Sequence, residues 1–157
     1  MPMTSKDKVL DRERARGRSA ALDLAARAPQ MTGTAIIAEE DNIPEWSEKA
    51  VYTAAMAGWP VRDNGQVYTI LNPHTPAYNP GVHPADLPAI YSIKHTQDPG
   101  RAKPFQPPNG TSGLYHEGDC CTQNGCVWQS LINDNAWSPE GYPTGWAYVG
   151  PVNEVQA

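Results

Sequence analysis

The chain has 157 residues, among them 13 glycines and 16 prolines, and charged residues make up 18% and hydrophobic residues 39%. A chain of this length holds one domain or two very small ones, which excludes large multidomain enzymes, and the turn-rich composition favours short strands over a long helical bundle. The net charge of -5 argues against nonspecific nucleic-acid binding by the whole molecule, and we find no apolar run long enough to span a membrane.

Charge and aromatic residues are distributed unevenly along the chain. Residues 1–30 carry seven basic and four acidic side chains, which gives a net charge of +3. The remaining residues carry five basic and thirteen acidic side chains, which gives a net charge of -8. All 13 aromatic residues lie between Trp46 and Tyr148, and 14 of the 16 prolines follow Ile43. The sequence therefore predicts a polar arm followed by an aromatic, turn-rich body.

The arm, residues 1–30, is predicted to be helical. Thr4 can cap the helix together with Asp7, and Pro29 ends a run rich in alanine and leucine. Because Gly17 weakens its centre and large apolar side chains are few, such a helix is marginal in water by itself. We expect an anchor that packs against another protein or another copy of the chain. The alternatives are a frayed extension and a nucleic-acid contact through four arginines, Arg12, Arg14, Arg16 and Arg18.

Residues 31–45 are predicted to form a linker with one short strand. The segment from Thr34 to Ala38 contains β-branched residues, which are enriched in strands. The acidic residues from Glu39 to Asp41 then indicate a turn.

The body contains an internal repeat. Residues 64–72 and 124–133 are similar, and each segment begins with Asn-Gly, which favours the two-residue turn of a β-hairpin. In the second hairpin this turn would place Gln123 opposite Cys126 and Cys121 opposite Trp128. Cys121 and Trp128 would then face the core together, and Cys120 would point to the other side.

These observations predict a mainly β fold. We expect two small, twisted hairpin or three-stranded modules in tandem, preceded by the helical arm. The first unit is predicted to span residues 46–98 and the second residues 114–150. They would be joined by a proline- and glycine-rich linker, residues 99–113, and followed by a tail, residues 151–157.

The second unit resembles a known family of sugar-binding modules. It contains a tyrosine separated by two residues from Gly-Asp, an Asn-Gly turn, an aromatic residue three positions later, and the sequences Trp-Ser-Pro and Pro-Thr-Gly-Trp. The residues are Tyr115, Gly118, Asp119, Asn124, Gly125, Trp128, Trp137, Ser138, Pro139, Pro143, Thr144, Gly145 and Trp146. This pattern resembles the chitin-binding type 3 module, carbohydrate-binding module families 5 and 12. The first unit resembles it less, because Gly58-Trp59-Pro60 replaces Gly-Asp and tyrosines take the later aromatic positions.

The resemblance implies a compact β-module whose surface rings stack on sugars. A pyranose has a weakly apolar C–H face that can lie flat on an indole or phenol ring, while neighbouring polar groups bind its hydroxyls. The candidate carbohydrate-binding residues are Trp137, Tyr142, Trp146 and Asn135 in the second unit, and Trp59, Tyr78 and Tyr91 in the first. Core packing is the alternative for every ring. We expect it for four aromatic residues at strand positions, Trp46, Tyr68, Tyr115 and Trp128.

The three cysteines cannot all pair within one chain, because their number is odd. We expect either an interchain disulfide through Cys120 or Cys126, or three reduced thiols. A zinc site is disfavoured because adjacent cysteines rarely bind the same ion. Neighbouring residues on a strand point to alternate faces, which disfavours a catalytic thiol with His116 as its base. We therefore expect no catalytic residue, no metal and no cofactor.

Together these features predict a nonenzymatic structural protein of a bacteriophage virion, in the tail, the baseplate or the capsid decoration. The N-terminal residues lack the apolar region of a secretory signal, so the chain is expected to fold in the host cytoplasm before assembly. Its arm would attach to other virion proteins, with self-association as a further expectation, and its β units would bind host surface glycans. The alternative is a free-standing chitin- or polysaccharide-binding module associated with a glycan-degrading system.

Overall fold

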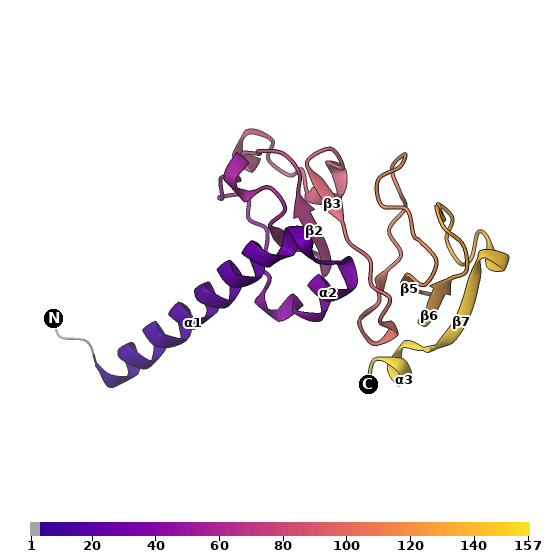
Figure 1. The fold of residues 1–157 in the computed structure, drawn as a ribbon, viewed down its shortest axis with the longest axis horizontal. Helices are drawn as coiled ribbons and strands as arrows, with labels where there is room; N and C mark the ends of the chain where they lie inside the picture. Colours follow the sequence, from indigo (N-terminus) through magenta and orange to yellow (C-terminus); the bar gives the residue numbers. More distant parts are fainter. Residues whose placement is uncertain (1–3) are drawn as a thin grey trace.

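A long helix projects from a body that contains two small β-sheets (Figure 1). This computed structural model describes residues 4–157. The helices are α1 (Ser5–Arg27), α2 (Gly33–Ala38) and α3 (Val152–Val155). The first sheet has the order β1-β2-β3 and consists of β1 (Pro60–Asp63), β2 (Gln66–Ile70) and β3 (Tyr91–Ile93). The second has the order β4-β5-β6-β7 and consists of β4 (Lys103–Pro104), β5 (Cys120–Gln123), β6 (Cys126–Ser130) and β7 (Trp146–Pro151).

The predicted order of a helical arm followed by two β units is confirmed. The description as mainly β holds only loosely, because helical residues make up 35% and β residues 24%. Many of the helical residues lie in short 3-10 turns, most of them led by a proline that presets the backbone angle. These turns are Ala28–Gln30, Glu40–Asn42, Ala54–Met56, Pro76–Tyr78, Pro84–Asp86, Pro99–Arg101 and Pro143–Gly145.

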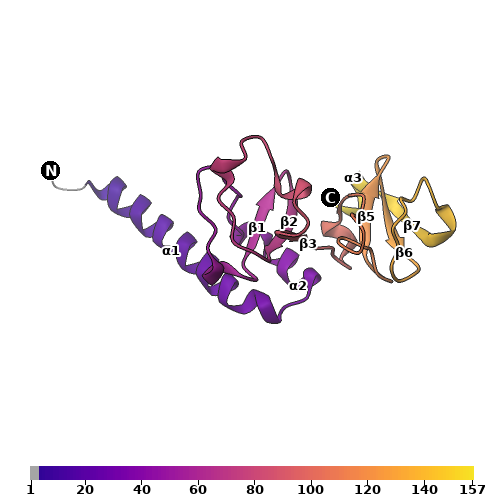
Figure 2. The same ribbon diagram turned by 90° about the horizontal axis from the view of Figure 1, so that it is seen from above.

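The helix α1 begins at the predicted cap. The Asp7 amide donates to the Thr4 hydroxyl at 3.1 Å, and the Thr4 amide donates to the Asp7 carboxylate at 3.1 Å. Residues 4–19 are all exposed, and Figure 2 shows this part of α1 extending away from the body. Burial begins only near the end of α1, at Leu24 and Ala25.

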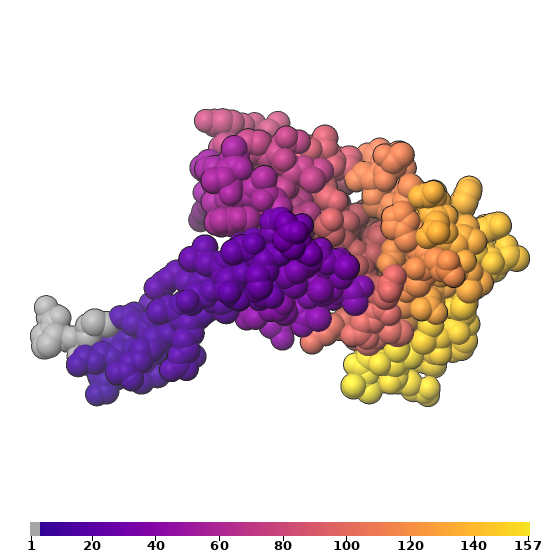
Figure 3. Space-filling model, viewed as in Figure 1, coloured from indigo at the N-terminus to yellow at the C-terminus, as the bar shows by residue number. Residues whose placement is uncertain are grey.

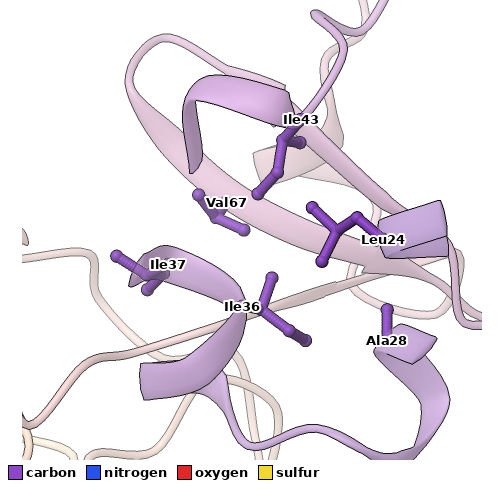
Figure 4. Close-up of a cluster of buried hydrophobic side chains, with 6 residues drawn as sticks. All are labelled: Leu24, Ala28, Ile36, Ile37, Ile43 and Val67. Atoms are coloured by element: carbon purple, nitrogen blue, oxygen red, sulfur yellow. The ribbon is translucent and has the colours of Figure 1, made fainter. Parts of the chain in front are cut away.

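A cluster of buried side chains fastens the end of α1 to the first unit (Figure 4). Leu24 is fully buried, and side chains from α1, α2 and β2 meet around it. The cluster consists of Leu24, Ala28, Ile36, Ile37, Ile43 and Val67. At its surface the Arg27 guanidinium donates to both carboxylate oxygens of Glu39, at 2.8 and 2.9 Å, which joins α1 to the end of α2.

The prediction of a strand at Thr34–Ala38 is wrong, because these residues lie in the helix α2. The Thr32 hydroxyl caps α2 by accepting a hydrogen bond from the Ala35 amide at 3.1 Å. Ile36 and Ile37 are both buried against Leu24 and its neighbours. The burial of this isoleucine pair outweighs the modest β-preference of branched side chains, which is context-dependent.

Both predicted hairpins are confirmed. The turn residues Asn64 and Gly65 have φ values of 50° and 77°, and Asn124 and Gly125 have 54° and 74°. Two successive positive φ values are what the type I′ turn requires. In the second hairpin Gln123 pairs with Cys126 and Cys121 pairs with Trp128, as the repeat analysis predicts.

The two units share one backbone arrangement. A third strand, β3 or β7, pairs antiparallel with the second strand of each hairpin, and it begins with a buried aromatic residue, Tyr91 or Trp146. Ahead of each hairpin a tyrosine exchanges two backbone hydrogen bonds with a later residue, Tyr52 with His74 and Tyr115 with Asn135. The sequence repeat therefore corresponds to a repeated topology.

The segments predicted as linker and tail belong to the second unit. Residues 99–113 contain β4, which pairs in parallel with β5. The helix α3, at the end of the chain, places Val152 and Val155 against the buried residues Ala102, Cys120 and Val127. Lys103 and Pro104, within the predicted linker, are therefore part of the second sheet.

Polar and stacking contacts join the two units. Gln66 on β2 donates to the Pro104 carbonyl on β4 at 2.8 Å. Glu40, between α2 and the first sheet, pairs with Arg101 at 3.1 Å and with Lys103. His95 stacks on Tyr115 with ring centroids 3.7 Å apart and an interplanar angle of 13°.

Truncation of the buried anchor of α1 should destabilise the fold. Leu24→Ala removes a fully buried side chain and leaves a cavity, which costs about 2–5 kcal/mol of unfolding free energy. Leu22→Ala is the matched control, because this neighbouring leucine is 57% exposed and its loss should have little effect. Urea unfolding of the two variants measures the difference. Equal losses of stability would contradict the docking of α1 through Leu24.

Stability should fall at mildly acidic pH because of His95. Burial lowers the pKa of His95 below its ordinary value of 6.5, so the folded protein favours the neutral ring. As the pH falls below 6.5, the unfolded chain takes up a proton that the folded state resists, and stability is lost. Urea unfolding at about pH 7.5 and about pH 5 should show this loss, and His95→Gln should reduce the pH dependence. An unchanged dependence in the variant would contradict this role.

Candidate functional site

The exposed aromatic side chains gather mainly on the second unit. The exposed fractions are 54% for Trp137, 41% for Tyr142 and 58% for Tyr148, and on the first unit Tyr78 is 83% exposed. Large rings usually enter the core of a small domain, because they supply much of its buried area. Rings left at the surface therefore mark a candidate binding site.

Trp137 and Tyr142 form a pair on the loop between β6 and β7. Their ring centroids are 5.3 Å apart and their planes are tilted by 49°. The Tyr142 ring lies over Gly145, where a Cβ would come within 2.5 Å of the Tyr142 Cδ1 atom. Gly145 is therefore required for the position of this ring. We call Trp137 and Tyr142 the aromatic platform.

Hydrogen bonds hold the loop that carries the aromatic platform. The Trp146 indole donates to the Trp137 carbonyl at 2.9 Å, and the Trp137 amide donates to Asn135 Oδ1 at 3.2 Å. The Tyr142 amide donates to the Ser138 carbonyl at 2.9 Å, which closes a turn between the two rings. The loop is thereby fixed at both ends and at its centre, so the platform is preorganised for a ligand.

Asn135 is a structural residue, and its prediction as a sugar ligand is wrong. The side chain is fully buried. Its Nδ2 donates to the Ser130 hydroxyl at 3.0 Å and to the Gly145 carbonyl at 3.3 Å. Both the amide nitrogen and the amide oxygen of this side chain are engaged inside the protein, where they support the aromatic platform from below.

The two closing aromatic residues also belong to the core, which corrects their prediction as carbohydrate contacts. Trp146 is 4% exposed and packs against Tyr115 with centroids 5.3 Å apart. Tyr91 is 1% exposed, and its hydroxyl lies 2.7 Å from His74 Nδ1 and 3.0 Å from the Trp46 indole nitrogen. Neither ring offers a face on which a sugar could stack.

The first unit does not reproduce the aromatic platform. Tyr78 is exposed in its 3-10 turn, but among residues 4–157 it has no aromatic neighbour like the Trp137–Tyr142 pair. Trp59 is half-buried and lines an apolar groove beside α1. The candidates of the first unit are therefore separate single rings.

Tyr148 is an exposed ring that is not among the candidates predicted from the sequence. This ring lies two residues after Trp146 on β7, and it packs edge-on against Trp128 with centroids 5.4 Å apart. Alternation along the strand puts Tyr148 on the face of the buried Trp146, which predicts a core position, so its 58% exposure is decided by the tertiary structure. Trp128 faces Cys121 as predicted and is only partly buried. Tyr148 and the partly buried Trp128 thus form a second ring pair on this unit, in which only Tyr148 is exposed.

The core residues predicted from strand positions are largely confirmed. Trp46, Tyr68 and Tyr115 are all buried. Burial raises the pKa of Tyr68 to about 12 and also raises that of Tyr115. These phenols therefore stay protonated over the ordinary pH range and act as packing groups.

The cysteines provide neither a reactive thiol in the core nor a metal site. Burial raises the pKa of Cys120 to about 11 and that of Cys121 to about 12, which keeps both thiols protonated. Cys120 is 2% exposed, so the interchain disulfide predicted for it does not fit this fold, whereas Cys126 is partly exposed. Within residues 4–157, no group of three or more His, Cys, Asp or Glu side chains could hold a metal ion.

Comparison with known proteins identifies no relative of this chain. No protein-family model matches the sequence, and a search of the curated proteins finds no match. No helix among the described residues is both long enough and apolar enough to cross a membrane.

Removal of the Asn135 amide should destabilise the second unit. Asn135→Ala leaves buried groups on Ser130, Gly145 and Trp137 without this hydrogen-bond partner, at a cost of about 1–3 kcal/mol of unfolding free energy. Asn79→Ala is the control, because Asn79 is exposed on the first unit. Thermal unfolding compares the two. A stable Asn135→Ala variant with reduced glycan binding would instead make Asn135 a ligand residue.

Proposed function

We propose that this chain is a nonenzymatic structural protein that binds carbohydrate through the aromatic platform of its second unit. The observation that carries the proposal is the exposed Trp137–Tyr142 pair, held on a loop whose buried supports, Asn135 and Trp146, have no access to ligand. The buried side chains of Asn135 and Trp146 hold the loop that carries these two exposed rings.

The chemistry of such a pair suits a sugar chain. Each ring can stack on the weakly apolar C–H face of a pyranose, and polar side chains nearby can bind hydroxyl groups. Because the two planes are tilted by 49°, one flat sugar cannot stack on both rings at once. The platform therefore suits adjacent sugars of a polysaccharide better than a monosaccharide. Stacking of this kind requires neither a metal nor a nucleophile.

The helix α1 supports a role as an attachment element. Residues 4–19 are exposed along its free part, and residues 1–30 carry a net charge of +3. A helix without tertiary packing is marginal in water, so this part of α1 requires a partner to be stable. We infer that the arm attaches the chain to an assembly and that the second unit faces outward.

The assembly that fits this combination best is a bacteriophage virion, in its tail, baseplate or capsid decoration, with host surface glycans as the ligand. The resemblance of residues 115–149 to chitin-binding type 3 modules supports the sugar, and the unpacked arm supports the attachment. A free-standing polysaccharide-binding module would use the same platform, but it would not need the arm. Detection of this polypeptide in purified native particles tests the assignment, and its absence from them would overturn it.

Loss of either platform ring should weaken glycan binding strongly without unfolding the protein. Trp137→Ala or Tyr142→Ala removes one stacking surface, which should weaken binding by about tenfold or more. Retention on insoluble chitin, followed by a glycan array, measures the loss. Tyr78→Ala is the matched control, because it removes a ring that is even more exposed, at 83%, from the first unit.

Two outcomes would contradict the assignment of the platform. If the wild-type protein is retained on no glycan, the second unit has a purely architectural role. If the Trp137 and Tyr142 variants lose their melting transition together with binding, the rings belong to the core.

A further inference from the structure

The part of the chain that carries the aromatic platform has negative charge only. From Pro104 to Ala157 there are five acidic residues and no lysine or arginine, so this segment has a net charge of -5 with His116 neutral. The acidic residues are Glu117, Asp119, Asp134, Glu140 and Glu154. The platform therefore lies in a region whose charged side chains repel anions and attract cations.

The basic residues nearest in sequence do not neutralise this region. Arg101 and Lys103 both pair with Glu40, which lies outside the second unit. Seven of the 12 basic residues belong to residues 1–30, and α1 projects from the side of the molecule opposite β6 and β7 (Figures 1 and 3). The negative charge around the platform is therefore open to a ligand.

Glu140 lies on the turn between the two rings of the aromatic platform. The Tyr142 amide donates to the Ser138 carbonyl at 2.9 Å, which closes this turn. The Glu140 amide donates to Gln123 Oε1, on β5, at 2.9 Å. Pro139 is buried, which anchors the same turn in the unit. The backbone that carries the Glu140 side chain is thus held in place.

The Glu140 carboxylate has no partner inside the part of the protein that the structure describes. Glu140 is exposed, and within residues 4–157 its carboxylate forms no ion pair and accepts no hydrogen bond. A carboxylate without a partner in the protein is available to a ligand. Because the faces of aromatic rings also attract cations, the platform rings and Glu140 favour the same kind of ligand, one that carries positive charge.

We propose that the aromatic platform and Glu140 together bind a polysaccharide of amino sugars that carry free, protonated amino groups. The two rings stack on the sugars, and Glu140 pairs with an ammonium group of the same chain. Glycans with phosphate or carboxylate groups are disfavoured, because Arg and Lys are the side chains that bind such groups and this unit presents neither. The inference rests on the proposed function, since it names the chemistry of the sugar that the platform binds.

Soluble oligosaccharides of equal length that differ only in acetylation test the proposal. Glucosamine oligomers carry a free amine on each sugar, whereas N-acetylglucosamine oligomers carry an uncharged amide. Calorimetric titration of the full-length chain is done at low salt and at a mildly acidic pH, where the amines are protonated and the protein keeps its melting transition. The glucosamine oligomer should bind about fivefold more tightly or better. Added salt should reduce this preference, because it screens exposed charges.

Glu140→Gln separates the role of this carboxylate from that of the rings. Glutamine keeps the size of the side chain and removes its charge, so the preference for the glucosamine oligomer should fall by about threefold. Glu154→Gln is the matched control, because it removes the same charge from an exposed position on α3, outside the platform loop. The control should keep the preference of the wild type.

Several outcomes would overturn the inference and leave carbohydrate binding by Trp137 and Tyr142 in place. Equal or tighter binding of the acetylated oligomer excludes a preference for amines, and so does equally tight binding of an acidic polymer such as polygalacturonate. An unchanged preference in Glu140→Gln, or an equal loss in both variants, excludes Glu140 as the specific ion partner. If the wild type binds no oligomer and no glycan on an array, the proposed function itself fails, and the inference fails with it.

Discussion

Each β unit is built around the burial of one closing aromatic residue, and the rest of the structure depends on that constraint. Two sheets of three and four short strands cannot enclose a large apolar core. Tyr91 and Trp146 supply the missing area at equivalent places, because each begins the third strand of its unit and pairs with the end of the hairpin. Trp146 fills the second core together with Tyr115 and Cys121, and Phe105 and Trp128 pack against them. Trp137 and Tyr142 are left at the surface, on a loop that the Trp146 indole helps to hold.

The two units use the same backbone with different polar chemistry beneath their loops. In the first, the Tyr91 hydroxyl lies between His74 and the Trp46 indole. In the second, where Trp146 has no hydroxyl, the amide of Asn135 connects the hairpin to the closing strand through Ser130 and Gly145. The second arrangement leaves Asn135 Oδ1 free to accept the Trp137 amide. This difference accounts for a fixed ring pair on one unit and an isolated exposed Tyr78 on the other.

The helix α1 divides into two parts with different energetic support. Its last turn is stabilised by Leu24 within the cluster formed with α2 and β2, and by the ion pair between Arg27 and Glu39. The preceding turns have only local support, namely the Thr4 cap and short-range ion pairs at the surface, which contribute a few tenths of a kcal/mol each. A helix that is packed against the body at one end and exposed to solvent along most of its length is suited to contact a partner molecule.

The sequence by itself determined the features that depend on near neighbours. The cap at Thr4, the end of the helix near Pro29, and both Asn-Gly turns with their register follow from local backbone preferences, and the structure has each of them. Tertiary structure decided the features that depend on which surfaces meet. Thr34–Ala38 is helical because Ile36 and Ile37 pack in a cluster with Leu24 and with Val67, which lies far from them in the chain. Likewise, Trp137 and Trp146 both lie close to prolines in the sequence, and only the fit of Trp146 beside Tyr115 decides which is buried and which is exposed. Burial is a property of the assembled core, so a pattern of residue types along the chain does not contain it.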